Sequence, residues 1–179
     1  SEHERHEQGL AVLKAKWVKR VQVGKEGQRS VRMRIVGKEF RAMDPSRRGL
    51  FTASCATSTS RVLDLFSANG DIYTLVGDAT NAYFQIDETE PICIELDNIP
   101  ELKAFAPPGS SYLKLLKKLY GRRDASAKFG EALAGHSMQV GAERCQVQPS
   151  IYFFKESGVK MEIHQDDFRA VCSTKDGLE

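Results

Sequence analysis

Three aspartates stand where short apolar segments of the chain end. Asp78 closes the segment IYTLVGD, and Asp166 and Asp167 are adjacent at the tip of a predicted hairpin. If their strands are neighbours in one sheet, three carboxylates meet and repel each other unless a divalent cation neutralises them. Two such ions can activate a hydroxyl and stabilise a leaving pyrophosphate. The pattern therefore indicates nucleotidyl transfer, although each aspartate taken singly is also an ordinary turn or strand-end residue.

Basic residues gather in two segments, although the formal net charge is only +2. Such stripes either follow a phosphate backbone or form an ordinary solvated face, and charge alone does not decide between these readings. The first segment consists of Lys14, Lys16, Lys19, Arg20, Lys25, Arg29, Arg32 and Arg34, and the second of Lys114, Lys117, Lys118, Arg122 and Arg123.

The composition is typical of a folded protein rather than a charged tail. Of 179 residues, 41% are hydrophobic and 28% are charged, enough for one domain or a domain with part of another. No apolar run approaches the roughly 18 residues of a membrane span, and the polar N-terminus lacks a signal-peptide core. We expect an intracellular protein, cytoplasmic or nuclear, that is not secreted and has no membrane partner.

Cysteines and histidines do not predict a metal centre of their own. His3 and His6 are one residue too close for the H-E-x-x-H pattern, so we expect a frayed, solvated terminus there. The cysteines contain no C-x-x-C pair, which favours reduced, mostly buried thiols over a zinc ribbon. They are Cys55, Cys93, Cys145 and Cys172.

Apolar periodicity predicts the elements that would position the aspartates. Helix caps at 57–60 begin a helix with Val62, Leu63, Leu65 and Phe66 on one face, ended by Asn69-Gly70. Asp124 is expected to cap a second helix that runs to about Val140, with Phe129 and Leu133 inward and Gly141 at its end. Strands are expected at 17–23, 30–36, 72–78, 92–96, 151–154, 159–163 and 168–172, with loops at 24–27 and 43–50, an irregular stretch at 100–109, and strand or helix at 112–120.

This order of helices and mostly antiparallel strands predicts an α+β fold. The first two strands form a hairpin with one basic face, because Val31, Met33 and Ile35 alternate with Arg32 and Arg34.

Four motifs, in order along the chain, are shared with one known family. Residues 32–40 (RMRIVGKEF) are similar to K-A-R-L-V-A-R-G-F, and residues 78–84 (DATNAYF) to D-V-K-N-A-F-L. Residues 119–129 (LYGRRDASAKF) are similar to L-Y-G-L-K-Q-A-P-R-A-W, and residues 164–167 (HQDD) to Y-V-D-D. From Leu13 onward, the chain thus resembles the copia-type retrotransposon reverse transcriptases.

The resemblance implies a right-hand polymerase palm with a ferredoxin-like antiparallel sheet, helices on one face and an N-terminal fingers hairpin. Residues 1–179 would be a partial reverse transcriptase domain, with the fingers hairpin and linker at about 13–50. The palm, with interleaved fingers segments, would occupy about 51–179. The thumb and ribonuclease H would be absent, so this stretch alone is expected to extend a primer negligibly.

The resemblance also implies an RNA-directed DNA polymerase that binds an RNA or DNA template with its primer and deoxynucleoside triphosphates. Asp78, Asp166 and Asp167 would be catalytic and would hold two Mg²⁺ ions, which Mn²⁺ could replace, with the Ala79 carbonyl completing one shell. Tyr83 would lie under the sugar and exclude a 2′-hydroxyl, or else pack in the core. Triphosphate would be met by Arg32, Arg34 or Lys38, and template and primer by Tyr120, Gly121, Arg122, Arg123, His164 and Gln165.

The chain departs from the family at several of these positions. His164 replaces Tyr, Gln165 replaces Val and Ser126 replaces Pro. Two acids are added, since Asp124 stands in place of Gln and Glu39 in place of Gly. Two alternatives therefore stay open: a catalytically inactive, transposon-derived nucleic-acid-binding domain, and an unrelated α+β domain.

Overall fold

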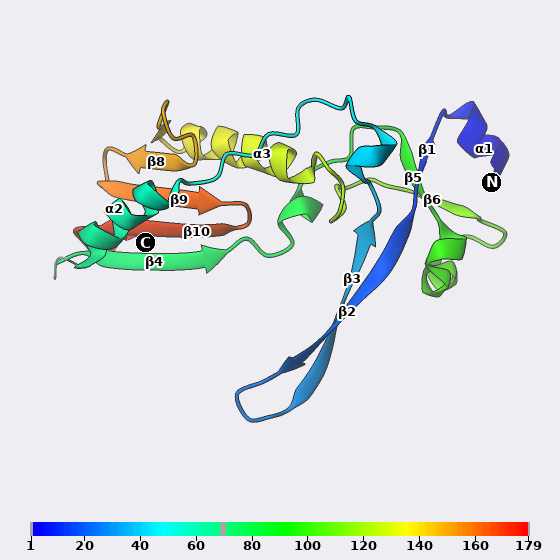
Figure 1. Cartoon of the computed structure of the whole chain (residues 1–179), viewed down its shortest axis with the longest axis horizontal. Helices are drawn as coiled ribbons and strands as arrows, with labels where there is room; N and C mark the ends of the chain where they lie inside the picture. The colour runs from blue at the N-terminus through cyan, green and yellow to red at the C-terminus, as the bar shows by residue number, and fades with distance from the viewer. Residues whose placement is uncertain (1, 69–70, 179) are drawn as a thin grey trace. The chain divides into compact units, whose positions relative to one another are not determined.

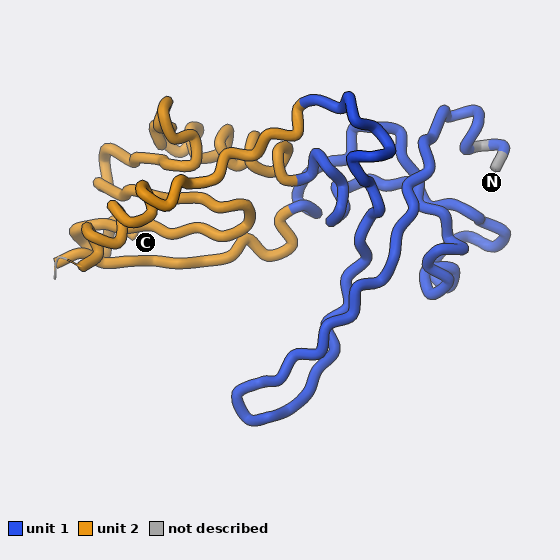
Figure 2. The backbone as a smooth tube through the Cα atoms, in the orientation of Figure 1, with its two compact units in different colours: residues 1–48, 83–125 blue, residues 49–82, 126–179 orange. Residues whose placement is uncertain are grey.

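The computed structural model describes residues 2–68 and 71–178, which form two compact units (Figure 2). Unit 1 comprises residues 1–48 and 83–125, and unit 2 comprises residues 49–82 and 126–179. Helices and largely antiparallel sheets both occur, which confirms the α+β class. Across the described ranges, no helix has the length and apolar character needed to cross a membrane.

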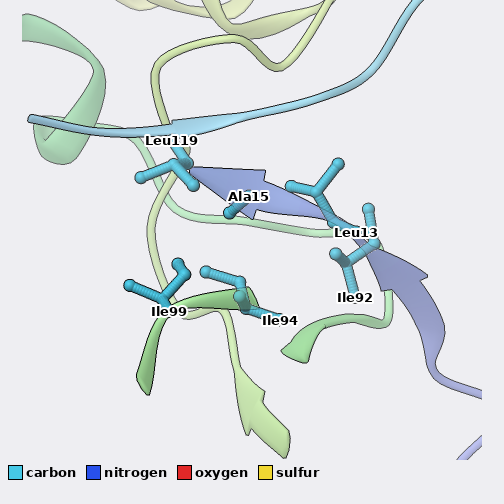
Figure 3. Close-up of a cluster of buried hydrophobic side chains, with 6 residues drawn as sticks. All are labelled: Leu13, Ala15, Ile92, Ile94, Ile99 and Leu119. Carbon is cyan, nitrogen blue, oxygen red and sulfur yellow. The ribbon is translucent and has the colours of Figure 1, made fainter. Parts of the chain in front are cut away.

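Unit 1 is built around a small three-stranded sheet. Strand β1 (Ala11–Leu13) pairs in parallel with β5 (Ile92–Glu95), which pairs antiparallel with β6 (Tyr112–Lys114). Unit 1 also contains short helices: α1 (Glu2–Glu7), η1 (Arg41–Met43), η3 (Leu96–Asn98) and η4 (Pro100–Phe105). The core brings together apolar side chains from three separate segments (Figure 3), namely Leu13, Ala15, Ile92, Ile94, Ile99 and Leu119.

A long two-stranded hairpin projects from the core of unit 1 (Figure 1). It consists of β2 (Ala15–Val23) and β3 (Arg29–Gly37), and its turn has Gly27 at a φ of 78°. Arg20 lies directly opposite Arg32, and Val18 opposite Arg34. Residues directly opposite share a face, so Lys16, Arg20, Arg32 and Arg34 form one basic face, as predicted.

Unit 2 holds a five-stranded antiparallel sheet in the order β4-β10-β9-β8-β7. Its strands are β4 (Tyr73–Asp78), β7 (Ala142–Arg144), β8 (Ile151–Phe154), β9 (Val159–His164) and β10 (Asp167–Cys172), and η5 (Asp176–Leu178) follows. Four of the strands were predicted from apolar alternation. The fifth, β7, was not predicted, because three residues are too short to show a period.

The two long helices contact opposite faces of this sheet. From α2 (Thr57–Ala68), the Ser60 hydroxyl donates to the Glu162 carboxylate, and the Ser60 carbonyl accepts from Arg169. From α3 (Ala125–Gln139), Ala134 packs with Ile163, a neighbour of Glu162 in β9 and therefore on the other face. The expectation of helices on one face is wrong, because β9 and β10 bury residues on both faces.

Helix α2 also buries less than its sequence pattern predicts. Only Leu63 is buried, whereas Val62, Leu65 and Phe66 are 40% exposed or more. The polar contacts of Ser60 with the sheet, rather than an apolar stripe, orient the helix. The predicted stop at Asn69-Gly70 lies outside the described residues.

Smaller predictions have mixed outcomes. The ambiguous segment at 112–120 begins as strand β6, and α3 ends before Gly141, whose φ is 91°. The N-terminal segment was expected to be frayed but forms α1, with His3 exposed and 3.4 Å from Glu7. All the cysteines are free, as predicted; Cys93 and Cys172 are buried, Cys55 is half-buried and Cys145 is exposed.

Candidate metal and nucleotide site

The sheet of unit 2 brings the candidate aspartates together at the ends of adjacent strands. Strands β4 and β10 lie side by side (Figure 1), and their register sets Asp78 directly opposite Asp167. Beyond the last pair, the Ala79 amide donates to the Asp166 carbonyl at 2.6 Å, which ties the segment after β4 to the hairpin tip. The predicted adjacency of these two strands is therefore confirmed. Asp78 and Asp167 are exposed, and Asp166 is half-buried.

A tight turn presents the aspartate pair. His164 pairs with Asp167, so the loop between β9 and β10 consists of Gln165 and Asp166 alone. Gln165 has a φ of 58°, a left-handed conformation that glycine usually supplies at the first central position of such hairpins. The other described non-glycine residue with positive φ is Asn81, at 55°, in the segment after Asp78. Strain of this kind, of order 1–3 kcal/mol per residue, gathers at functional sites.

Gly77 lets the end of strand β4 pack closely against a side chain of the neighbouring strand β10. A Cβ at Gly77 would lie 2.3 Å from the ring of Phe168, which pairs with it across β10. The Phe168 ring therefore covers the glycine backbone on the face opposite Asp78 and Asp167. This packing fixes the register that sets the two carboxylates side by side.

The donor chemistry of these strand ends fits a hard divalent cation. Asp78, Asp166 and Asp167 supply only carboxylate oxygens, the ligands that Mg²⁺ prefers. Within the ranges 2–68 and 71–178, no three histidine, cysteine or acidic side chains are already arranged to hold a metal ion. The backbone thus juxtaposes the acids, while their convergence on an ion stays a prediction. His164, which shares the face of Asp167, is exposed beside them.

In unit 1, Tyr120 joins two of the predicted nucleotide-binding residues. Its ring lies 4.7 Å from the Tyr83 ring and 5.5 Å from the Phe84 ring, measured between centroids. The Arg34 guanidinium lies 5.0 Å from the centre of the same ring, a cation–π arrangement. Arg34 and Tyr83 are thereby held on one aromatic residue. Arg32 lies further along the hairpin and is exposed.

The glycine after Tyr120 is required by close packing against the hairpin. Gly121 has a φ of 85°, and a Cβ there would lie 2.1 Å from the Gly37 carbonyl oxygen. The Gly37 amide donates to the Tyr120 carbonyl at 2.6 Å. Gly121 thus positions Tyr120 on β3. Lys38, which follows Gly37 at the end of β3, is half-buried and lines a cavity of 190 Å³ in unit 1.

A buried cluster of charged residues, which we call the ion cluster, lies in unit 1. Lys118 has a side chain only 1% exposed, and its Nζ lies 2.6 Å from Glu88 and 2.7 Å from Asp124. Arg122, at 2% exposure, contacts Glu88 at 3.0 Å and Glu90 at 2.8 Å. The full set is Glu39, Arg47, Glu88, Glu90, Lys118, Arg122 and Asp124.

The ion cluster corrects two expectations about the second basic segment. Lys118 and Arg122 were expected to face nucleic acid, but both are buried and paired with acids, so they present no cation to a phosphate. Arg123 is half-buried and donates to the Asp44 carbonyl. Asp124, expected as a helix cap, directs its carboxylate at Lys118, Arg122 and Arg47. In this segment, Lys114 and Lys117 are exposed.

Two acids of the ion cluster have lowered pKa values. Burial would raise the pKa of Asp124, but the hydrogen bond from Lys118 and the charges of Arg122, Lys118 and Arg47 outweigh it, so the pKa lies below its usual value. Burial would also raise the pKa of Glu90, but the hydrogen bond from Arg122 and the charges of Arg122 and Arg47 outweigh this effect, so the pKa lies below its usual value. Both acids are therefore ionised at neutral pH and hold their cations in place.

Acid is expected to destabilise unit 1 through these groups. Because the folded-state pKa values of Asp124 and Glu90 are lowered, their contribution is complete above the unfolded-state values and is lost as pH falls through the folded-state values. We expect the urea midpoint to fall as the pH drops below about 4.5. In Asp124→Asn, the fall should be shallower. Asp97→Asn, at an exposed acid, should follow the wild type, and equal slopes in all three proteins would contradict the assignment.

Neither the ion cluster nor the contacts of Tyr120 with Tyr83 and Arg34 were predicted from the sequence. No periodicity links Glu88 and Glu90 with Lys118, because paired and solvated charges look alike in a sequence. The available signal was the presence of two acids, Glu39 and Asp124, at positions where the resembling family has uncharged residues. Both belong to the ion cluster.

Comparison with known proteins adds no relative. No protein-family model, no curated protein and no solved structure matches this chain.

Proposed function

We propose that the chain is the fingers and palm portion of a copia-type retrotransposon reverse transcriptase, an RNA-directed DNA polymerase with a right-hand palm. The observation that carries the proposal is the pairing of β4 with β10, which sets Asp78 opposite Asp167 and bonds Ala79 to Asp166. Nucleotidyl transfer needs acids from two distant segments at one point, and this register supplies them. The left-handed Gln165 and Asn81 beside the same acids support it.

In this proposal, each group has a distinct role. Asp78, Asp166 and Asp167 hold two Mg²⁺ ions, or Mn²⁺ in their place, with help from the Ala79 carbonyl. When bound, such ions lower the pKa of the attacking hydroxyl and neutralise charge on the leaving group. The primer 3′-oxygen attacks the α-phosphorus of a deoxynucleoside triphosphate, and the bond to pyrophosphate breaks in line. Tyr83 meets the sugar, and Arg34, held on Tyr120, meets the triphosphate.

The test is incorporation of a labelled deoxynucleotide into a primer annealed to RNA or DNA, with Mg²⁺ or Mn²⁺, by a longer protein in which a thumb follows these residues. Incorporation that requires both the metal and Asp78 supports the polymerase. Mn²⁺ binding followed by electron paramagnetic resonance gives a second readout that does not depend on turnover. Duplex binding with neither metal binding nor incorporation would favour the second candidate.

The second candidate is a nucleic-acid-binding domain, derived from a transposon, that has lost catalysis. It is favoured by the basic face of the hairpin, where Arg20 lies directly opposite Arg32. Like charges opposite each other on a two-stranded sheet destabilise it, so an anionic partner would relieve a cost present in the free protein. A phosphate backbone provides such a partner.

Both candidates predict strongly salt-dependent binding through the hairpin. We expect Arg20→Gln to lower the slope of log affinity against log salt by about 1 for a primer–template duplex. The same change should leave thermal stability equal or higher, because it removes a like-charge pair. Fluorescence anisotropy and thermal denaturation measure the two effects. Lys155→Gln, at an exposed lysine of unit 2 paired with Glu143, is the control, and an equal loss in both variants would argue against the hairpin.

A further inference from the structure

Unit 2 contains a cavity of 270 Å³ that the roles proposed above do not use. This volume is near the low end of ligand pockets, which span about 300–1,000 Å³. Helix α3 forms one wall, the neighbouring strand β8 another (Figure 1), and the segment at 51–53 a third. Gln165, next to the aspartate pair, also lines it. The cavity therefore reaches the candidate catalytic turn from within unit 2.

The cavity carries an unsatisfied polar atom on α3. The Ser126 hydroxyl is buried and has no hydrogen-bond partner within the described part of the chain. A buried hydroxyl without a partner is costly, because it has lost water and gained nothing in exchange. A rotation of the Ser126 side chain into the cavity would let a bound molecule with a hydroxyl, carbonyl or ring nitrogen remove that cost. Proline, which the resembling family has at this position, could not form such a bond.

Arg144 lines the same cavity, and one edge of its guanidinium can bind an anion. The Arg144 Nε donates to the Pro149 carbonyl at 2.6 Å, and the guanidinium lies 5.8 Å from the centre of the Tyr152 ring. These contacts fix the plane of the guanidinium. Among the described residues, neither Nη atom has a hydrogen-bond partner, so both can donate to one phosphate.

The remaining walls suit a flat ring. Tyr152 and Ile163 are buried at 2% and 8% exposure, and Leu133 completes the apolar surface. Phe51, at 82% exposure, offers a further aromatic face at the cavity. The Arg144 guanidinium, polar residues such as Ser126 and these apolar and aromatic walls together match one nucleotide. Glu131 also lines the cavity, and its carboxylate is paired with Lys128 at 2.9 Å.

We propose that this cavity holds one nucleotide of the bound strand, with its phosphate on Arg144 and its sugar or base edge on Ser126. The proposal rests on the proposed function for the identity of the strand. This nucleotide would lie against the α3 face of the sheet, whereas Asp78 and Asp167 belong to the opposite face. The 2′-hydroxyl of RNA and a base edge are both partners for Ser126, and matched RNA and DNA strands separate them.

Two glycines of α3 provide the test. A Cβ at Gly130 or at Gly135 would meet no atom within 4 Å, so neither position excludes a side chain, and leucine favours helix more than glycine does. Only Gly130 lines the cavity. We expect Gly130→Leu to weaken binding of a fluorescein-labelled RNA or DNA strand roughly tenfold, the scale of one lost charge-assisted contact. Gly135→Leu should bind as the wild type does, and circular dichroism should show both variants folded.

Side-chain variants then separate the contacts. Arg144→Gln should weaken RNA and DNA binding equally and lower the salt slope by about 1, whereas Arg61→Gln, on α2, should not. Ser126→Ala should weaken binding of RNA alone if Ser126 contacts the sugar. It should weaken binding of both strands if Ser126 contacts the base edge. Either result supports binding in the cavity. Equal binding by the Gly130 and Gly135 variants overturns the inference but leaves the proposed function standing. Failure of the wild type to bind either strand overturns both.

Discussion

In a longer protein that also carries a thumb, Asp78→Asn is expected to reduce metal-dependent nucleotide incorporation by about three orders of magnitude or more. The carboxylate loses its charge but keeps its size, so the ion it holds loses an anionic ligand. Stabilisation of transition-state charge by metal ions is worth several kcal/mol, and each 1.36 kcal/mol is about tenfold in rate. The readout is single-nucleotide extension of a labelled primer with Mg²⁺, repeated with Mn²⁺.

The geometry extends this expectation to β10. Because Asp167 is the register partner of Asp78, Asp167→Asn should lose incorporation and Mn²⁺ binding together with it. Asp71→Asn, at an exposed aspartate before β4, is the matched control and should retain both. Thermal denaturation should place all three variants close to the wild type, since Asp78 and Asp167 are exposed. Full incorporation by Asp78→Asn would remove the basis of the polymerase proposal.

The strands that carry these acids could be predicted from the sequence because alternation survives in them. Ile163 and Phe168 bracket four polar residues, which indicates a hairpin tip wherever its strands lie. Periodicity did not predict that Asp78 lies beside this tip, because a local sequence pattern does not show which strands pair with each other. The expectation came from the chemistry of clustered carboxylates and from the resemblance. The register between β4 and β10 then bore it out.

Other elements left too little signal. Strands β1 and β7 have three residues each, shorter than any period can reveal. The polar helix α1 has no apolar face. In α2, apolar spacing predicted a buried face, but a hydrogen bond between Ser60 and Glu162 orients the helix instead. Such a hydrogen bond joins residues that are far apart in the sequence, and the residue types alone do not predict it.

The same reasoning explains why the second basic segment was misread. Lys117 and Lys118 are neighbours of the same type, yet the first is 49% exposed and the second 1%. Each pairs with an acid at 2.6 Å, Lys117 with Asp87 and Lys118 with Glu88. Only the fold decides which of the two is stripped of water. That difference in burial also decides what each ion pair contributes to stability.

Lys118→Met is accordingly expected to lower the free energy of unfolding by about 3–5 kcal/mol. The change keeps the length of the side chain but leaves Glu88 and Asp124 buried without the ammonium that both contact. Arg122 still contacts Glu88 and Arg47 still contacts Asp124, but the four acids of the ion cluster then face only two cations. Removing one partner of a buried pair costs far more than the intact pair contributes. Urea denaturation followed by circular dichroism measures the loss.

Lys103→Met is the matched control, because its Nζ also lies 2.6 Å from an acid, Asp97, but the lysine side chain is 51% exposed. A solvated pair of this kind is worth about 0–1 kcal/mol. Adding Asp124→Asn to Lys118→Met should recover part of the loss, because it removes one of the two carboxylates that lost the ammonium. If Lys118→Met costs no more than Lys103→Met and Asp124→Asn adds its full separate cost, the ion cluster does not hold unit 1 together. The base of the basic hairpin must then be fixed by the apolar core around Leu13 and Leu119 and by the hydrogen bond from Gly37 to Tyr120.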